Sequence, residues 1–298
     1  MTEFKGVVPA IVTPMTPEGE INEDAFRKLL DFNIEAGAHG FWVAGGGGEC
    51  VLLSDDENKR LAEIAVEQAA GRAFIIMHVG ALTTRSAVAM AEHAAKVGAD
   101  AICCVPPFFY RIGEDAVVEH YRTVAAAADL PLFVYNLPQS TGVEITPDYL
   151  EKIADRVPQL AGLKHSAPEF TNNIAFVKMG MRCFTGNARL MLSALTLGAA
   201  GCVDGAPCAA PEPWVEIWNA YQEGDHKRAE AAQRRATEVQ NLLIQAGAVY
   251  PANVKALASE RLGIELGDPR PPIPPATAEQ RDRIRQGAAR LGLLGVAV

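Results

Sequence analysis

The chain has 298 residues, of which 49% are hydrophobic and 21% charged, an ordinary globular composition that excludes collagen, coiled coils and disordered chains. Its 27 Lys and Arg against 36 Asp and Glu give a net charge of −9, so we expect no nucleic-acid partner and no membrane partner. No apolar run approaches the roughly 18 residues that span a bilayer, and the first residues lack the pattern of a signal peptide. We therefore expect a cytoplasmic protein.

Six cysteines are scattered through apolar segments without a C-x-x-C pair, which predicts buried free thiols in a reducing compartment rather than disulfides or a zinc site. The six histidines show no metal-ligand spacing such as H-x-x-x-H. We expect neither a metal nor another cofactor.

Strand-length apolar runs alternate with helix-length amphipathic segments along most of the chain. The eight apolar runs are 6–13, 39–44, 73–79, 100–105, 130–136, 160–164, 183–186 and 201–205. The helical patterns that follow them are 23–36, 55–70, 83–97, 114–128, 147–156, 168–179, 187–198 and 211–223. Continuous apolar strands joined by helices are typical of a parallel sheet that is covered on both faces.

Eight such units predict an α/β protein with a (β/α)8 TIM barrel over residues 1–223. A doubly wound open sheet is the alternative, but it usually has fewer strands and an early nucleotide-binding fingerprint. Residues 224–298 hold three further helical patterns, 225–246, 252–261 and 277–292, and no strand pattern. We expect them to form a C-terminal helical region packed on the barrel.

Lys164 is the first candidate for chemistry, because catalytic side chains of such barrels lie at the carboxyl ends of strands. It is the only one of nine lysines that ends an apolar strand, in LAGLK. Apolar surroundings favour a neutral amine, which can condense with a ketone to form a Schiff base. The alternative is a lysine whose charged end reaches solvent at the barrel mouth.

Two other features end neighbouring or nearby strands. Tyr135 ends the strand before that of Lys164, in FVYNLPQSTG, and could reach a substrate held there; the alternative for this residue alone is a structural tyrosine that caps the barrel. The run Gly45–Gly48 follows the second strand and fails both the dinucleotide and the P-loop patterns. It is therefore either a tight turn or a cradle of backbone N–H groups for a keto-acid carboxylate. For His165 we expect a packing role.

These motifs lie in a chain that resembles the dihydrodipicolinate synthase / N-acetylneuraminate lyase family of Schiff-base lyases. The resemblance spans nearly the whole sequence and is carried by GVVPAIVTPMTPEGEIN, PPFFYR, YNLPQSTG, GLKHS, TGNA and the tail PRPPIPP. It implies a (β/α)8 barrel with C-terminal helices, usually assembled as a homotetramer of two tight dimers. It also implies that Lys164 forms the imine and that Tyr135 transfers protons. The substrate-binding candidates are Gly46, Gly47, Gly48, Ser140, Gly186, Arg189 and Val203.

Several residues depart from the family pattern. The usual G-(T/S)-T-G-E is Gly-Gly-Gly-Gly-Glu here, so the hydroxyls expected at Gly46 and Gly47 are missing. Phe109 stands where many members place a relay tyrosine, so a relay through residues 46 and 109 cannot operate. Ser140 replaces the arginine of the synthases, which predicts poor dihydrodipicolinate synthase activity. Arg189 stands where sialic acid lyases have acidic residues, and favours dicarboxylic substrates unless it faces solvent.

Three functions remain open at this point. The favoured one is a class I lyase that forms a Schiff base with pyruvate or a longer 2-keto acid, acting as an aldolase or as a dehydratase of 2-keto-3-deoxy sugar acids. The second is a keto-acid-binding or regulatory protein with reduced catalysis, or else a protein with dihydrodipicolinate synthase activity in name only. The third is a phosphate-binding barrel that uses Gly186 and Gly205.

Overall fold

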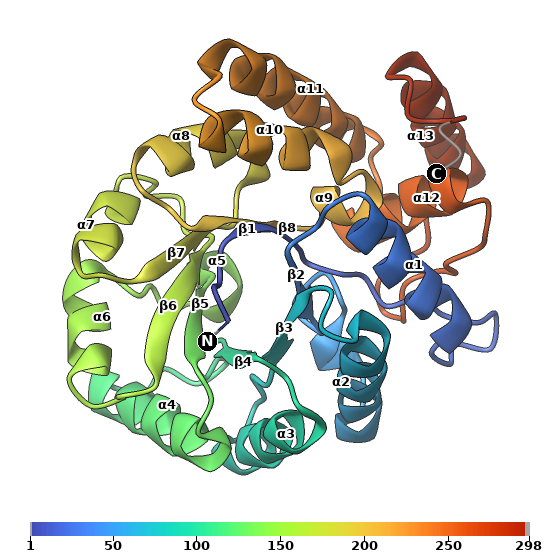
Figure 1. Cartoon of the computed structure of the whole chain (residues 1–298). Coiled ribbons are helices and arrows are strands. Elements are labelled where there is room, and N and C mark those ends of the chain that lie inside the picture. The colour runs from blue at the N-terminus through green and yellow to red at the C-terminus, as the bar shows by residue number, and fades with distance from the viewer. Residues whose placement is uncertain (1, 296–298) are drawn as a thin grey trace.

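The computed structural model describes residues 2–295, and its centre is a ring of eight parallel strands (Figure 1). The strands are β1 (Gly6–Pro9), β2 (Gly40–Val43), β3 (Phe74–His78), β4 (Ala101–Cys104), β5 (Leu132–Asn136), β6 (Leu160–His165), β7 (Arg182–Thr185) and β8 (Gly201–Asp204). They pair in the order β1-β8-β7-β6-β5-β4-β3-β2. Backbone bonds from Ile11 N to Trp42 O (3.2 Å) and from His39 N to Val7 O (2.9 Å) join the two end strands. The predicted (β/α)8 barrel is confirmed.

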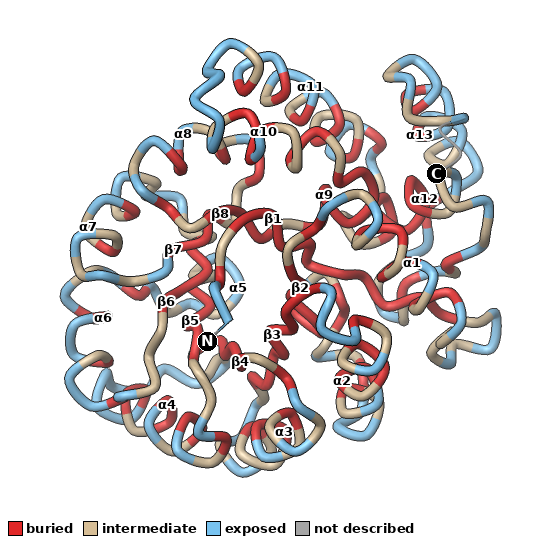
Figure 2. The backbone as a smooth tube through the Cα atoms, viewed as in Figure 1, coloured by how far each residue is buried: buried red, intermediate tan, exposed pale blue. Residues whose placement is uncertain are grey.

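Helices surround this ring, with their exposed faces outward and the buried strands at the centre (Figure 2). Those of the barrel are α1 (Glu23–Glu35), α2 (Asp55–Ala69), α3 (Thr84–Val97), α4 (Glu114–Ala128), α6 (Pro147–Ala154), α7 (Asn172–Lys178), α8 (Met191–Thr196) and α10 (Glu212–Gln222). Four short turns of helix were not predicted as separate elements: η1 (Cys50–Leu52), α5 (Pro138–Thr141), η2 (Ala188–Leu190) and α9 (Ala206–Ala209). They are too short to show a helical period in the sequence.

Local signals in the sequence explain where the helices begin and end. Ser54 and Glu57 form a capping box at the start of α2, in which each side chain accepts a hydrogen bond from the other residue's backbone N–H. Gly98 ends α3 in the left-handed conformation (φ +90°), which a residue with a side chain rarely adopts. The chain then enters β4, so the helix–Gly–strand junction positions the strand that follows.

Two apolar layers fill the molecule. Side chains on alternate strand residues point into the barrel, where Trp42, Ile76, Phe133 and Phe184 belong to one buried cluster. The intervening residues, such as Ile75 and Met77, belong to a second cluster between the strands and the helices. The barrel is therefore a packed core whose upper inward-facing residues form the floor of any site at the strand ends.

The C-terminal helical region comprises α11 (His226–Gln245), α12 (Tyr250–Leu262) and α13 (Ala278–Arg290), with the last three residues of the predicted region outside the described residues. Its buried side chains Leu243, Val254 and Ile284 belong to the same apolar cluster as the barrel helices. Arg261 of α12 pairs with Glu212 of α10 at 2.6 Å. The division of the chain at residue 223 stays a prediction, because the two parts share one core.

The described residues bear on two further expectations, the state of the cysteines and the presence of membrane-spanning helices. All six cysteines have free thiols, and five of them are buried as the sequence predicted, whereas Cys50 is half-buried. No helix in this part of the chain is both long and apolar enough to cross a membrane.

Candidate active site

The structure brings Lys164 and Tyr135 together inside the barrel, at the carboxyl ends of the strands. They lie directly opposite each other in the register of β5 and β6. The Lys164 Nζ is 4.3 Å from the centroid of the Tyr135 ring and 5.5 Å from that of Trp42. Lys164 is only 5% exposed, and none of the ion pairs among residues 2–295 includes it. A buried amine held by aromatic faces instead of a carboxylate keeps its nitrogen available for chemistry.

The glycine run follows β2 beside this pair. A Cβ atom built on Gly46 would meet only the Tyr135 hydroxyl, at 3.8 Å, so the place of the missing side chain is open. Gly48 has no such room, because a Cβ there would lie 3.0 Å from Ala44 Cα and 3.1 Å from the carbonyl oxygen of Ile11. Thr13 donates a 2.7 Å hydrogen bond to the carbonyl of Gly48 and fixes the loop. The loop is thus held in place around one open position.

A cavity of about 270 Å³ lies above these residues and includes Gly46, Tyr135 and Ser140 in its wall. Most of its remaining wall is apolar, formed by Val51, Leu52, Val105, Phe108, Leu137 and Ile273. Its size suits a small metabolite rather than a polymer. Lys164 is not part of this wall and lies against the inner face of Tyr135.

The other predicted substrate-binding residues lie outside the cavity wall. Gly47 lies close to the barrel backbone, because a Cβ built on it would be 3.4 Å from the carbonyl oxygen of Ala10. Val203 is fully buried in the barrel interior. Gly186 packs so tightly on Ser166 that a Cβ would lie 1.8 Å from its hydroxyl. Arg189 is exposed on η2, so the structure favours the solvent-facing alternative for this residue.

His78 is a site residue that the sequence analysis missed. It ends β3, is 2% exposed, and its ring stands edge-on to Tyr135 with the centroids 6.2 Å apart. Burial, and then the nearby charge of Lys164, lower the pKa of His78 to about 4, so the ring is neutral at pH 7. The available signal was its place in AFIIMHV, where it falls on the inward face of the strand.

His165, by contrast, is tied into the scaffold. Its Nδ1 lies 3.2 Å from the Asn136 amide and its Nε2 lies 2.9 Å from the carbonyl oxygen of Glu169. Burial lowers the pKa of His165, and both ring nitrogens have partners. These contacts agree with a packing role.

The C-terminal region also reaches the site, which the sequence did not predict. Ile273 contributes to the cavity wall, and Glu49 of the glycine loop accepts a 2.6 Å hydrogen bond from the backbone N–H of Arg270. The same carboxylate lies 2.6 Å from Lys255 Nζ in α12. The loop is thus positioned from both sides, by the barrel and by the C-terminal helices.

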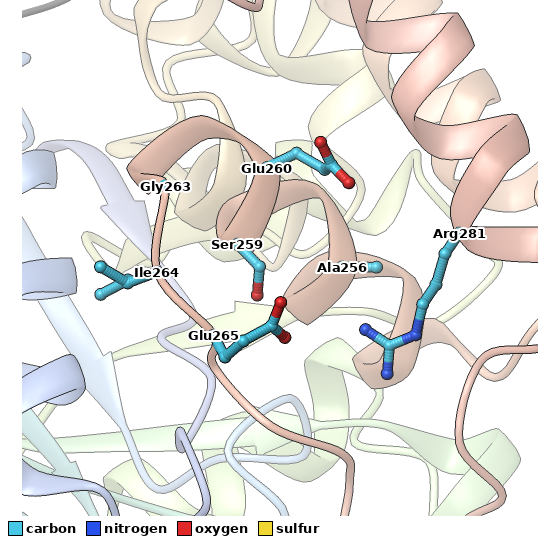
Figure 3. Close-up of a pocket in the computed structure, with 7 residues that line it drawn as sticks. All are labelled: Ala256, Ser259, Glu260, Gly263, Ile264, Glu265 and Arg281. Atoms are coloured by element: carbon cyan, nitrogen blue, oxygen red, sulfur yellow. The ribbon is translucent and has the colours of Figure 1, made fainter. Parts of the chain in front are cut away.

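A second cavity, of about 300 Å³, lies between α12 and α13 (Figure 3). Its wall includes Glu260, Glu265 and Arg281, and Arg281 pairs with Asp268. Ser259 accepts a 3.0 Å hydrogen bond from the backbone of Leu266. These groups belong to the C-terminal region alone, so this cavity is separate from the residues at the strand ends.

Comparison with known proteins gives the family. Residues 3–290 match the Dihydrodipicolinate synthetase family. The chain belongs to this family. An uncharacterized DapA-like lyase of Halobacterium salinarum is 36% identical, covering 97% of this chain and 94% of the relative. A 4-hydroxy-tetrahydrodipicolinate synthase of Methanopyrus kandleri is 31% identical, covering 98% of each chain.

A solved structure extends the comparison. A catalytic lysine mutant of the Ruminococcus gnavus sialic acid aldolase matches with a TM-score of 0.93 and 26% identity, covering 97% of this chain and 96% of that one. The resemblance inferred from the motifs is therefore confirmed at the level of fold and family. The family includes lyases, and the substrate of this chain is a separate question.

Proposed function

We propose that this protein is a lyase that acts through an imine between Lys164 and pyruvate or a longer 2-keto acid. The observation that carries the proposal is the buried Lys164 amine, held 4.3 Å from the Tyr135 ring centroid without an acidic partner. The sialic acid aldolase relative supports it, since that protein is described as having a catalytic lysine.

The chemistry follows from the two side chains. After giving up a proton, the Lys164 amine adds to the C2 carbonyl, and the keto oxygen leaves as water after taking up two protons. The resulting protonated imine draws electrons from C3, so that a proton or a C3–C4 bond can be released there and an enamine forms. Tyr135 lies next to Lys164, and its hydroxyl can carry protons to and from the substrate oxygen. Backbone N–H groups of Gly46–Gly48 are the candidate partners of the carboxylate.

The cavity indicates which end groups would be accepted. Its outer wall is mostly apolar, and the charged side chain in it, Glu49, is already paired with Lys255. Ser140 offers a neutral hydroxyl, and Arg189 lies exposed outside the wall. An uncharged, largely apolar aldehyde fragment therefore fits better than a second carboxylate.

Two alternatives carry different weight. A keto-acid-binding protein with reduced catalysis is favoured by one observation, the open position at Gly46 beside the Tyr135 hydroxyl. A phosphate-binding barrel gains no support, because the backbone N–H of Gly186 already donates to the His165 carbonyl (2.8 Å) and that of Gly205 to the Asp204 carboxylate (2.6 Å).

Reductive trapping tests the proposal. Incubation with pyruvate and borohydride should add a stable mass to Lys164, and Lys164→Ala should abolish it. An adduct that persists in Lys164→Ala would contradict the assignment of Lys164 as the imine-forming residue. Exchange of the pyruvate methyl hydrogens in heavy water, followed by NMR, separates the alternatives, because a binding protein would form the imine without exchange.

The family resemblance also implies a homotetramer, which stays part of this proposal. Phe109 is 82% exposed and Tyr110 75% exposed, with their rings 5.1 Å apart. Neighbouring exposed aromatic side chains are typical of surfaces that another chain covers.

A further inference from the structure

His78 places a polar ring at the carboxyl end of β3, inside the barrel. Strand β3 alternates between the barrel interior at Ile76 and the helix layer at Met77, so His78 points inward like Ile76. It lines the same cavity as Tyr135 and Gly46. A polar ring therefore stands where the strands otherwise place apolar or reactive side chains.

Neither ring nitrogen of His78 makes a well-aligned hydrogen bond within residues 2–295, although the backbone of Ala44, just before the glycine run, lies close to the ring and opposes the lowering of its pKa. Two other buried histidines differ: His120 Nδ1 lies 2.9 Å from the Thr84 hydroxyl, and His165 Nε2 lies 2.9 Å from the Glu169 carbonyl oxygen. A buried polar group without a partner destabilises the fold, so native proteins rarely keep one without a functional reason. A ligand that enters the cavity is such a reason.

The strand register places His78 beside the incomplete carboxylate cradle. Val43 lies opposite Met77 in the pairing of β2 with β3, so the chain that leads into the glycine run leaves β2 level with His78. Gly46 and Gly47 supply no side-chain donor there. The neutral imidazole has one N–H to donate and one nitrogen that accepts.

We propose that His78 is a substrate-binding residue whose ring N–H donates a hydrogen bond to the carboxylate of the 2-keto acid held on Lys164, in place of the hydroxyls absent at Gly46 and Gly47. The inference rests on the proposed function, because the carboxylate is brought to this position by the imine. His78 thereby accounts for a family site that has lost its side-chain donors.

The test compares two ligands that differ only in the negative charge. Pyruvate and its neutral methyl ester both form imines, but only pyruvate presents a carboxylate. The half-saturating concentration of each is measured by borohydride trapping, with the adduct located on Lys164 by mass spectrometry. The variants are His78→Phe, which keeps a ring against Tyr135, and His78→Gln, which keeps an N–H donor. His120→Phe is the control for losing a buried histidine elsewhere.

His78→Phe should raise the half-saturating concentration of pyruvate about tenfold or more and leave that of methyl pyruvate within about twofold. His78→Gln should recover part of the loss, and His120→Phe should change neither value. Equal weakening of both ligands, or no change in either, would overturn the inference while the adduct on Lys164 still supported the imine. Should the parent protein give no adduct on Lys164, the proposed function fails and this inference falls with it.

Discussion

Lys255 Nζ lies 2.6 Å from Glu49 Oε1, and both side chains are shielded from solvent, at 1% and 0% exposure. Glu49 closes the glycine loop with a left-handed backbone (φ 64°), a strained conformation for a residue with a side chain. Burial is the main cause that lowers the pKa of Lys255, and the carboxylate of Glu49 opposes it. The ion pair therefore fixes the loop next to Lys164 from a helix of the C-terminal region.

Removing one member of this pair should be costly. Lys255→Met leaves the Glu49 carboxylate buried without its partner, and we expect the free energy of unfolding to fall by about 3–5 kcal/mol. Urea denaturation measures this change. Lys152→Met is the matched control, because Lys152 and Glu114 form a solvent-exposed pair, and such pairs contribute little to stability. Equal effects of the two substitutions would show that the buried pair does not brace the loop.

The open position at residue 46 can be filled. Gly46→Ser adds a Cβ whose nearest neighbour outside the adjoining residues is the Tyr135 hydroxyl, at 3.8 Å, so we expect unchanged stability and a lower half-saturating concentration of pyruvate in trapping. Gly48→Ser, two residues on, meets backbone atoms at 3.0 and 3.1 Å and should destabilise the protein by about 1–3 kcal/mol. A Gly46→Ser variant as unstable as Gly48→Ser would contradict the open position.

The barrel and its principal pair could be predicted because their signals are local. The point where an apolar run stops marks the carboxyl end of a strand. Lys164 and Tyr135 lie at the ends of two strands that follow each other in the chain. The same rule applies to His78, but the apolar run in the sequence continues to Val79, so the pattern places the strand end one residue after His78. Strand periodicity alone cannot show that a ring nitrogen lacks a partner.

Lys255 and Ile273 could not be predicted in the same way. Their helix and loop show amphipathic or proline-rich patterns, which predict local structure but not the surface on which it docks. For Arg189 the sequence left two orientations open, since the first turn of a helix can face a barrel mouth or solvent. Only the packing of η2 places it on the surface.

Exposed aromatic side chains near the cavity should be covered by another copy of the chain. Phe109 and Tyr110 follow Phe108, which lines the cavity, so an interface here would border the site. Replacing both with Ser should shift the sedimentation coefficient towards smaller species. Ile244→Ser, at a residue 50% exposed on α11, is the control and should leave the assembly intact. Unchanged sedimentation of the double variant would exclude this surface as an interface.

Arg189→Ala should leave catalysis unaltered. The side chain is exposed and lies outside the cavity wall, so kcat/KM for mono- and dicarboxylic 2-keto acids should each stay within about twofold of the parent. Ser140 does line the cavity, and Ser140→Arg should selectively raise activity towards an aldehyde that carries a carboxylate. A selective loss of dicarboxylate turnover in Arg189→Ala would show that this arginine does contact the substrate.

Stability should depend on pH through the buried histidines. Burial lowers the pKa of both His78 and His120 to about 4, against about 6.5 for an unfolded chain. Below pH 6.5 the unfolded state therefore binds more protons than the folded state, and the free energy of unfolding falls as the pH drops towards 4. Between pH 7 and pH 5 each histidine should account for about 2 kcal/mol, a window that lies above the range in which the surface carboxylates titrate.

Urea titrations at pH 7 and pH 5 measure this dependence. His120→Phe should lose stability at both values, because it breaks the contact with Thr84, but its decline between them should be smaller than that of the parent by about 2 kcal/mol. A parallel decline in parent and variant would show that His120 is protonated in the folded protein. The same comparison with His78→Phe reports whether that ring is neutral beside Lys164.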